Sequence, residues 1–106
     1  MASAEIDSGI CGFCTTVRTT GAGDGRTVRL EFETDCGHVQ KLAECLTEVD
    51  AYREISYRGE GPLTLRLAAE HLVHPACPVP SGIIKAIEVE AELAFPKDAS
   101  IKPSKQ

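Results

Sequence analysis

The strongest constraint on the fold is a run of strictly alternating apolar and polar residues over 26–34 (RTVRLEFET). Its apolar side chains all fall on one side of an extended chain: Val28, Leu30 and Phe32. Residues 13–20 (FCTTVRTT) precede it and are rich in β-branched side chains. Between the two runs, residues 21–25 (GAGDG) supply the glycines and the aspartate of a tight turn. The sequence therefore predicts a β-hairpin with one buried and one solvated face.

Helical periodicity follows the hairpin. Apolar residues recur every three or four positions over 37–49, which predicts a first amphipathic helix. Pro62 suits the first turn of a second helix that ends near Leu72. Ser81 is expected to cap a third helix that reaches Phe95.

Two segments between these helices are less regular. Residues 51–58 fit either a third strand or a helical turn, and residues 73–80 hold three prolines and predict a loop. Together the elements predict an α+β fold, in which a small antiparallel sheet is packed by about three helices. The expected organisation is a flexible tail over 1–9, one domain over 10–95 and a second flexible tail over 96–106.

Composition narrows the partners and the compartment. The chain has 106 residues and a net charge of −5, the wrong sign for a protein that binds nucleic acid or anionic lipid. The first ten residues contain no Lys or Arg and no apolar run, so no secretory signal is expected. No stretch is apolar enough to span a membrane. A cytoplasmic, reducing location is expected, where clustered cysteines more often bind metal or do redox work than form stable disulfides.

Five cysteines are many for so short a chain, and four of them fall at predicted element ends. Cys11 and Cys14 form a CxxC where the first hairpin strand begins, although Cys14 could instead point into the hairpin. Cys36 lies between the second strand and the first helix, and Cys77 lies in the proline-rich loop. The two outer ends of a hairpin meet. We therefore expect these four thiols to converge on zinc or an iron–sulfur cluster.

Other cysteines and histidines are weaker candidates. His74 lies three residues before Cys77 and is a further candidate metal ligand. His38 follows Cys36 by two residues and could join or polarise the site. Cys45 falls at the edge of the first helix's apolar stripe, where we expect a small buried hydrophobic residue.

Some other functions of cysteine do not fit this context. In a thioredoxin-like fold the CxxC follows a strand and opens a helix, whereas here it opens a strand. A cysteine protease needs one thiol paired with a histidine in a cleft, and nothing here distinguishes one thiol from the others. The glycines of 21–25 form a hairpin turn rather than a phosphate-binding loop.

Several short motifs occur in a specific order: CG at 11–12, LEFETDCG at 30–37, LTE at 46–48, HPAC at 74–77 and KAIE at 85–88. In order and spacing they make the chain resemble the IscU/NifU-type iron–sulfur scaffold domain. The resemblance covers roughly residues 10–93. It implies an IscU/SufE-like α+β fold with Cys11, Cys36 and Cys77 as ligands of a labile cluster or of zinc. It also implies sulfur-donor or cluster-acceptor proteins as partners.

The chain departs from that family at informative positions. Phe13 stands where the family has an aspartate that keeps the cluster transferable, and Pro75 and Ala76 separate the family's His-Cys pair. Cys14 is an additional thiol. The family's N-terminal helix is missing. These changes favour a tightly held metal over a transferable one.

The sequence thus predicts a small metal-binding protein, a scaffold or carrier rather than an enzyme, that is a monomer or weak homodimer. One alternative is a structural zinc-binding or protein-interaction module, in which metal compensates for a core poor in aromatic residues. Another is a thiol or persulfide sulfur carrier that uses Cys11 and Cys14.

Overall fold

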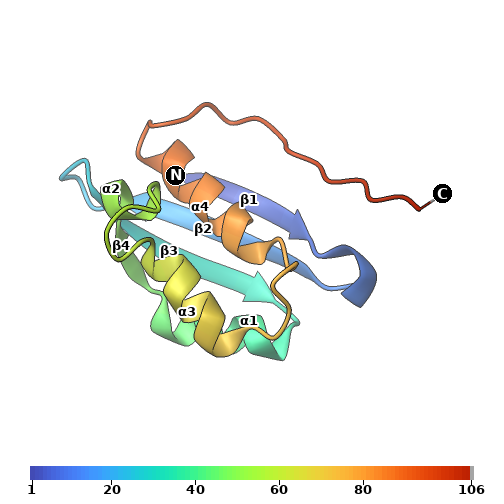
Figure 1. The fold of residues 1–106 in the computed structure, drawn as a ribbon. Coiled ribbons are helices and arrows are strands. Elements are labelled where there is room, and N and C mark those ends of the chain that lie inside the picture. The colour runs from blue at the N-terminus through green and yellow to red at the C-terminus, as the bar shows by residue number, and fades with distance from the viewer. Residues whose placement is uncertain (106) are drawn as a thin grey trace.

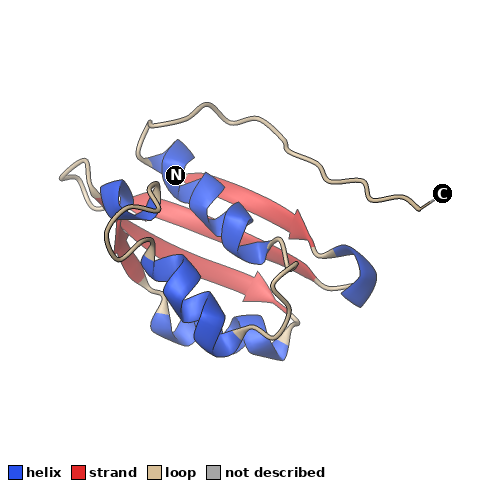
Figure 2. Ribbon diagram, in the orientation of Figure 1, coloured by secondary structure: helices blue, strands red, loops and turns tan. Residues whose placement is uncertain are grey.

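The predicted hairpin forms the middle of a four-stranded antiparallel sheet in the computed structural model, which describes residues 1–105 (Figures 1 and 2). The strands lie side by side in chain order: β1 (Ala2–Asp7), β2 (Cys14–Gly21), β3 (Thr27–Thr34) and β4 (Glu48–Asp50). The helices are the 3₁₀ turn η1 (Gly9–Cys11), α1 (Gly37–Cys45), α2 (Ala51–Glu54), α3 (Leu63–His71) and α4 (Val79–Glu90). The α+β class is confirmed.

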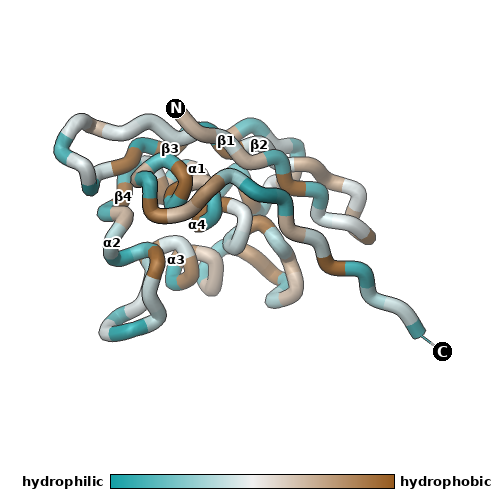
Figure 3. The backbone as a smooth tube through the Cα atoms, turned by 90° about the horizontal axis from the view of Figure 1, so that it is seen from above, coloured by the Kyte–Doolittle hydropathy of each residue, from teal (hydrophilic) through white to brown (hydrophobic). Residues whose placement is uncertain are grey.

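The strand register places all the apolar strand residues on one face. Val17 lies opposite Phe32, and Thr19 lies opposite Leu30. Helix α4 packs on β1 and β2, α1 packs on β3, and α3 contacts both helices, so the helices form a second layer on that face (Figures 1 and 3). The largest side chains of this core are fully buried: Leu42, Leu46, Ile83 and Ile87. The opposite face of the sheet is polar and solvated.

The N-terminal segment is a strand rather than the predicted tail over 1–9. Residues Ala2–Asp7 pair with β2, with Ala4 opposite Val17. The segment alternates, because Ala2, Ala4 and Ile6 face the helices while the residues between them are exposed. Small alanines are poor strand formers. Burial of Ile6 against the core is what makes the strand favourable.

One carboxylate joins the end of α4 to this edge of the sheet. Glu90 Oε1 accepts a hydrogen bond from the Ala2 backbone N–H at 2.7 Å and another from the Thr19 hydroxyl at 3.2 Å. Its other oxygen accepts from the Gly21 N–H at 3.2 Å. The pairing of β1 is therefore fixed by both packing and hydrogen bonds.

Asp24 organises the turn between β2 and β3. Its carboxylate accepts hydrogen bonds from the backbone N–H of Thr27 at 2.7 Å and of Arg26 at 2.9 Å, and from the Thr27 hydroxyl at 2.6 Å. These donors, the Thr27 hydroxyl above all, lower the pKa of Asp24 to about 2. The glycines of the turn supply the positive φ angles, at Gly23 and Gly25.

The first helix is shorter than predicted, because the chain returns to the sheet. α1 ends at Cys45, and the Thr47 carbonyl accepts a hydrogen bond from the Leu30 N–H at 2.9 Å. Val49 fits the apolar stripe of a helix in the sequence, but in the structure it lies on β4 and pairs with Val28 of β3. The strand that was predicted as a possible third one is therefore β4, and it lies just before the segment 51–58. That segment begins with the helical turn α2.

The last helix is displaced toward the N-terminus relative to prediction. α4 begins at Val79 rather than after Ser81, because Pro80 fits the first helical turn, where no backbone donor is needed. It ends at Glu90 rather than Phe95, since Glu92 adopts a left-handed conformation with φ 60°. No residue from 95 to 105 lies in a helix or strand, and this segment runs away from the fold (Figures 1 and 3). Gln106, part of the predicted tail, lies outside the described residues.

No helix within residues 1–105 is both long and apolar enough to cross a membrane.

Gly82 provides a test of the β1–α4 contact. A Cβ at this position would collide with the Cγ1 and Cδ1 atoms of Ile6. Overpacking of this kind costs about 1–3 kcal/mol, against a gain of about 1 kcal/mol in helix propensity. Because two atoms of the buried Ile6 side chain would collide with the new methyl group, the cost falls at the upper end of this range, and we expect Gly82→Ala to lower the free energy of unfolding by about 2 kcal/mol in urea denaturation.

Gly37 is the matched control, because it is also a helical glycine and a Cβ there would meet nothing within 4 Å. Gly37→Ala should leave stability unchanged or slightly raised. Equal stability of Gly82→Ala and the wild type would show that β1 is not packed against α4.

Candidate functional site

Strand pairing brings four of the five cysteines to one end of the molecule. Cys14 begins β2, and the adjacent Thr15 pairs with Thr34, two residues before Cys36. Cys11 lies in η1, the connection from β1 to β2. The α3–α4 loop, which holds Cys77, lies at this same end (Figure 1). We call the region of Cys11, Cys14, Cys36 and Cys77 the thiol end.

Cys36 occupies the N-cap position of α1. Its backbone N–H donates to the Thr34 hydroxyl at 3.2 Å, and its carbonyl accepts from the Gln40 N–H at 2.9 Å. Its thiol makes no capping hydrogen bond. The side chain is partly buried against the hydrophobic core, so it lies on the helix-covered side of the sheet.

Cys77 closes a turn within the proline-rich loop. Its backbone N–H donates to the His74 carbonyl at 3.1 Å. Like Cys36, it is partly buried against the core. The His74 side chain is exposed. The turn therefore fixes the backbone between His74 and Cys77 and leaves the imidazole in solvent.

Cys11 and Cys14 are both exposed. Thr15 and Val17 point into the core, and side chains alternate along a strand, so Cys14 projects on the face opposite the helices. Cys11 is flanked in η1 by Gly9 and Gly12, both of which have positive φ. The predicted CxxC is thus a solvent-facing pair at the sheet's end.

The four thiols share an end but are not gathered into a metal centre. Among residues 1–105 there is no group of three or more His, Cys, Asp or Glu side chains that could hold a metal ion. Cys36 and Cys77 lie toward the helices, whereas Cys14 lies on the other face. All are free thiols, so the donor chemistry fits a thiophilic metal, but the connections around them would have to move for one ion to reach all four.

Cys45 lies away from this end and is exposed, so the expectation of a buried hydrophobic residue is wrong. It is the last residue of α1, roughly 14 Å along the helix axis from Cys36 at 1.5 Å per residue. The shortened helix explains its exposure, because the chain turns toward β4 immediately afterwards. His38, in the first turn of α1, is exposed as well.

The thiol end also exposes large apolar side chains. Ile10 and Phe13 flank Cys11, and Val73 lies in the loop that holds Cys77. All three exceed one third exposure, and Ile10 is fully exposed. The sequence signal for this exposure was the presence of large apolar residues within segments that form turns. Exposed apolar side chains and exposed thiols therefore lie together at this end.

The chain belongs to a family described as a family of unknown function (DUF6951), which matches residues 2–103. Comparison with curated proteins and with solved structures gives no match. The match begins at β1 and includes the segment after α4. Family membership therefore covers nearly the whole chain, and function must be argued from its own residues.

Thiol reactivity tests the placement of the cysteines. In the metal-free, reduced protein we expect iodoacetamide to modify the exposed Cys11, Cys14 and Cys45 before the partly buried Cys36 and Cys77. Peptide mass spectrometry over a time course measures the order. Modification of Cys36 as fast as Cys45 would contradict its packing against the core.

Proposed function

We propose that this chain is a small metal-binding protein that holds zinc or an iron–sulfur cluster at the thiol end, as a scaffold or carrier rather than an enzyme. The ligands are Cys11, Cys14, Cys36 and Cys77, with His74 as a further candidate. One observation carries the proposal: three separate segments deliver four free thiols to the same end of one small sheet. Thiolate and imidazole are the donors that such metals prefer.

Binding must be coupled to movement of the connections. Cys11 lies between two glycines with positive φ, in a turn without buried residues. Cys77 follows an exposed stretch, 73–76, that contains His74. Both segments have few contacts to lose, whereas Cys36 is anchored at α1. The free energy of metal binding would then order the thiol end, as it orders small metal-dependent domains.

The resemblance to IscU/NifU-type scaffolds supports the cluster form of this proposal. It matches Cys11, Cys36 and Cys77 to the ligand cysteines of those proteins. Phe13 replaces the aspartate associated with release, and Cys14 adds a fourth thiol. The bound group is therefore expected to be held more tightly than in a transfer scaffold.

Partners of this protein would dock at the same end. The exposed Ile10, Phe13 and Val73 supply an apolar surface beside the thiols. A sulfur-donor or cluster-acceptor protein fits that chemistry, and the acidic net charge disfavours nucleic acid. We infer a reducing, cytoplasmic location, because clustered unpaired cysteines are typical of such compartments. We further propose that the chain is a monomer or weak homodimer.

A second candidate function is transfer of sulfur as a persulfide, and the exposure of both Cys11 and Cys14 favours it. A thiolate here would attack the terminal sulfur of a donor persulfide, form a new S–S bond and release the donor thiolate.

The third reading, a structural zinc or protein-interaction module, uses the same ligands without transfer. The metal content and its lability separate these functions.

Anaerobic purification, followed by metal and acid-labile sulfide analysis and a visible spectrum, tests the leading proposal. We expect bound zinc, or iron with sulfide and a visible absorption, in the wild type. Cys36→Ala should lose most of it, because Cys36 is the anchored ligand, while Cys45→Ala keeps it, because Cys45 lies at the other end of α1.

Three results would contradict the metal proposal: trace metal in the reduced wild type, equal metal in wild type and Cys36→Ala, or equal loss in both variants. Trace metal together with a sulfane-sulfur adduct on Cys11 or Cys14 would favour the sulfur carrier. Circular dichroism of both variants shows whether a loss reflects ligation or unfolding.

A further inference from the structure

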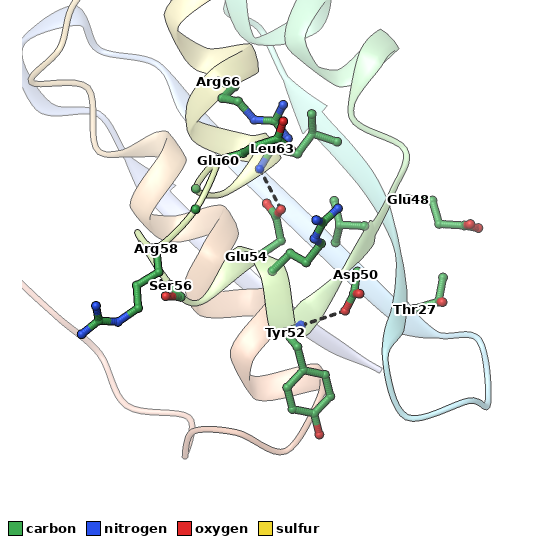
Figure 4. A pocket seen from close by; sticks show the side chains of 14 residues that line it. Thr27, Glu48, Asp50, Tyr52, Glu54, Ser56, Arg58, Glu60, Leu63 and Arg66 are labelled. Carbon is green, nitrogen blue, oxygen red and sulfur yellow. Dashed lines mark hydrogen bonds between the residues drawn. The ribbon is translucent and has the colours of Figure 1, made fainter.

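A cavity of about 570 Å³ lies at the end of the molecule opposite the thiols (Figures 1 and 4). Its walls are β4, α2, the loop 56–62 and the start of α3. The volume falls within the range of small-molecule sites. The lining is mostly polar, so a ligand there would be recognised by charge and hydrogen bonds.

Three arginines line this cavity, and they differ from the other three in the chain. Arg18, Arg26 and Arg29 are each paired with a carboxylate, at N–O distances of 3.1, 2.7 and 3.4 Å. Within the part of the chain that the structure describes, the remaining arginines make no ion pair. All of these line the cavity: Arg53 from α2, Arg58 from the loop and Arg66 from α3. We call the space the arginine cavity.

The carboxylates of the cavity are mostly occupied by other partners. Glu48 pairs with Arg29, and Asp50 pairs with Arg26. The Arg26 hydrogen bond lowers the pKa of Asp50, which keeps that pair ionised. Glu60 is a lining acid without such a partner among residues 1–105.

Glu54 is buried in the cavity floor and is held by α3. Its carboxylate accepts from the Leu63 N–H at 2.8 Å, the Thr64 N–H at 2.9 Å and the Thr64 hydroxyl. The N-terminus of α3 partly offsets its charge. Glu54 therefore orders the start of α3, and the three arginines face two acids, Glu54 and Glu60, that have no ion-pair partner among residues 1–105.

We propose that the arginine cavity binds the phosphate group of a small molecule. Arginine donates forked hydrogen bonds that match an oxyanion. The two oxygens of a carboxylate can both be hydrogen-bonded by one guanidinium. A phosphate group has more oxygens, so it can accept hydrogen bonds from arginines on α2, on the loop and on α3 together. Its negative charge near neutral pH, about −1.5 to −2, also has the sign that the three arginines without a carboxylate partner favour.

The geometry indicates how the site closes. In the view of Figure 4, Arg66 lies above Glu54, whereas Arg58 points away from Glu54 and outward from the loop. Arg58 is next to Gly59, which has positive φ. Rotation of its long side chain would bring the guanidinium over the cavity. Ser56 and Tyr52 on the rim offer hydroxyl groups to the rest of the ligand.

Titration of the full chain with inorganic phosphate and with phenyl phosphate, followed by amide NMR, tests this site. We expect shifts in 50–66 with both probes, and tighter binding of the ester if the natural ligand is a metabolite. Arg53→Gln/Arg66→Gln should weaken binding at least about tenfold, because it removes charge-assisted hydrogen bonds from two of the three elements.

Arg18→Gln/Lys41→Gln is the matched control, since it removes the same charge from positions outside the cavity, and Glu33, the ion-pair partner of Arg18, does not line the cavity either. It should bind phosphate as the wild type does. Equal weakening in both variants, shifts spread over the whole surface, or no binding of either probe would overturn the proposal. Unchanged spectra of residues outside the substituted region show that both variants are folded.

Discussion

The antiparallel register of β2 and β3 is the constraint on which the rest of the structure depends. With Val17 opposite Phe32 and Thr15 opposite Thr34, the apolar residues of both strands face the helices. A slip of one residue would turn one strand's apolar side chains to solvent. The same register determines that the start of β2 and the end of β3 meet. The core and the thiol end are therefore consequences of one pairing.

The hairpin and the start of α1 could be predicted because their signals are local. Strict alternation defines β3, and the glycines between the strands allow few structures other than a turn. The end of α1 could not be predicted in this way. Val49 fits both a helical stripe and a strand, and the choice is made by β3, whose Leu30 N–H bonds to the Thr47 carbonyl. Tertiary hydrogen bonding overrides local periodicity there.

The first strand was missed for a related reason. Alanine at positions 2 and 4 gives a weak strand signal, and only Ile6 is strongly apolar. The stability of β1 comes from α4, about 80 residues later in the chain, through the close contact at Gly82 and the hydrogen bonds to Glu90. No local window of sequence contains that information. The period-two pattern of Ala2, Ala4 and Ile6 was the available sign.

The two ends of the molecule differ in how far sequence could define them. Cysteines are scarce in most chains, so their positions at element ends already predicted convergence, although not that Cys14 and Cys36 lie on different sides of the sheet. Arginines are common on surfaces, and Arg53, Arg58 and Arg66 are distinguished only by lacking an ion-pair partner among residues 1–105. The cluster of Arg, Glu and Gly over 53–61 was the only local hint.

The central claim is that thiols from separate segments bind one metal, and X-ray absorption of the zinc-loaded protein tests it most directly. Fitting the zinc edge counts the sulfur ligands, which lie at about 2.3 Å in such sites. We predict three or four sulfurs, since Cys36 or Cys77 must join Cys11 and Cys14. Two sulfurs or fewer would contradict this prediction, because the exposed Cys11 and Cys14 supply that number from a single turn without any other segment of the fold.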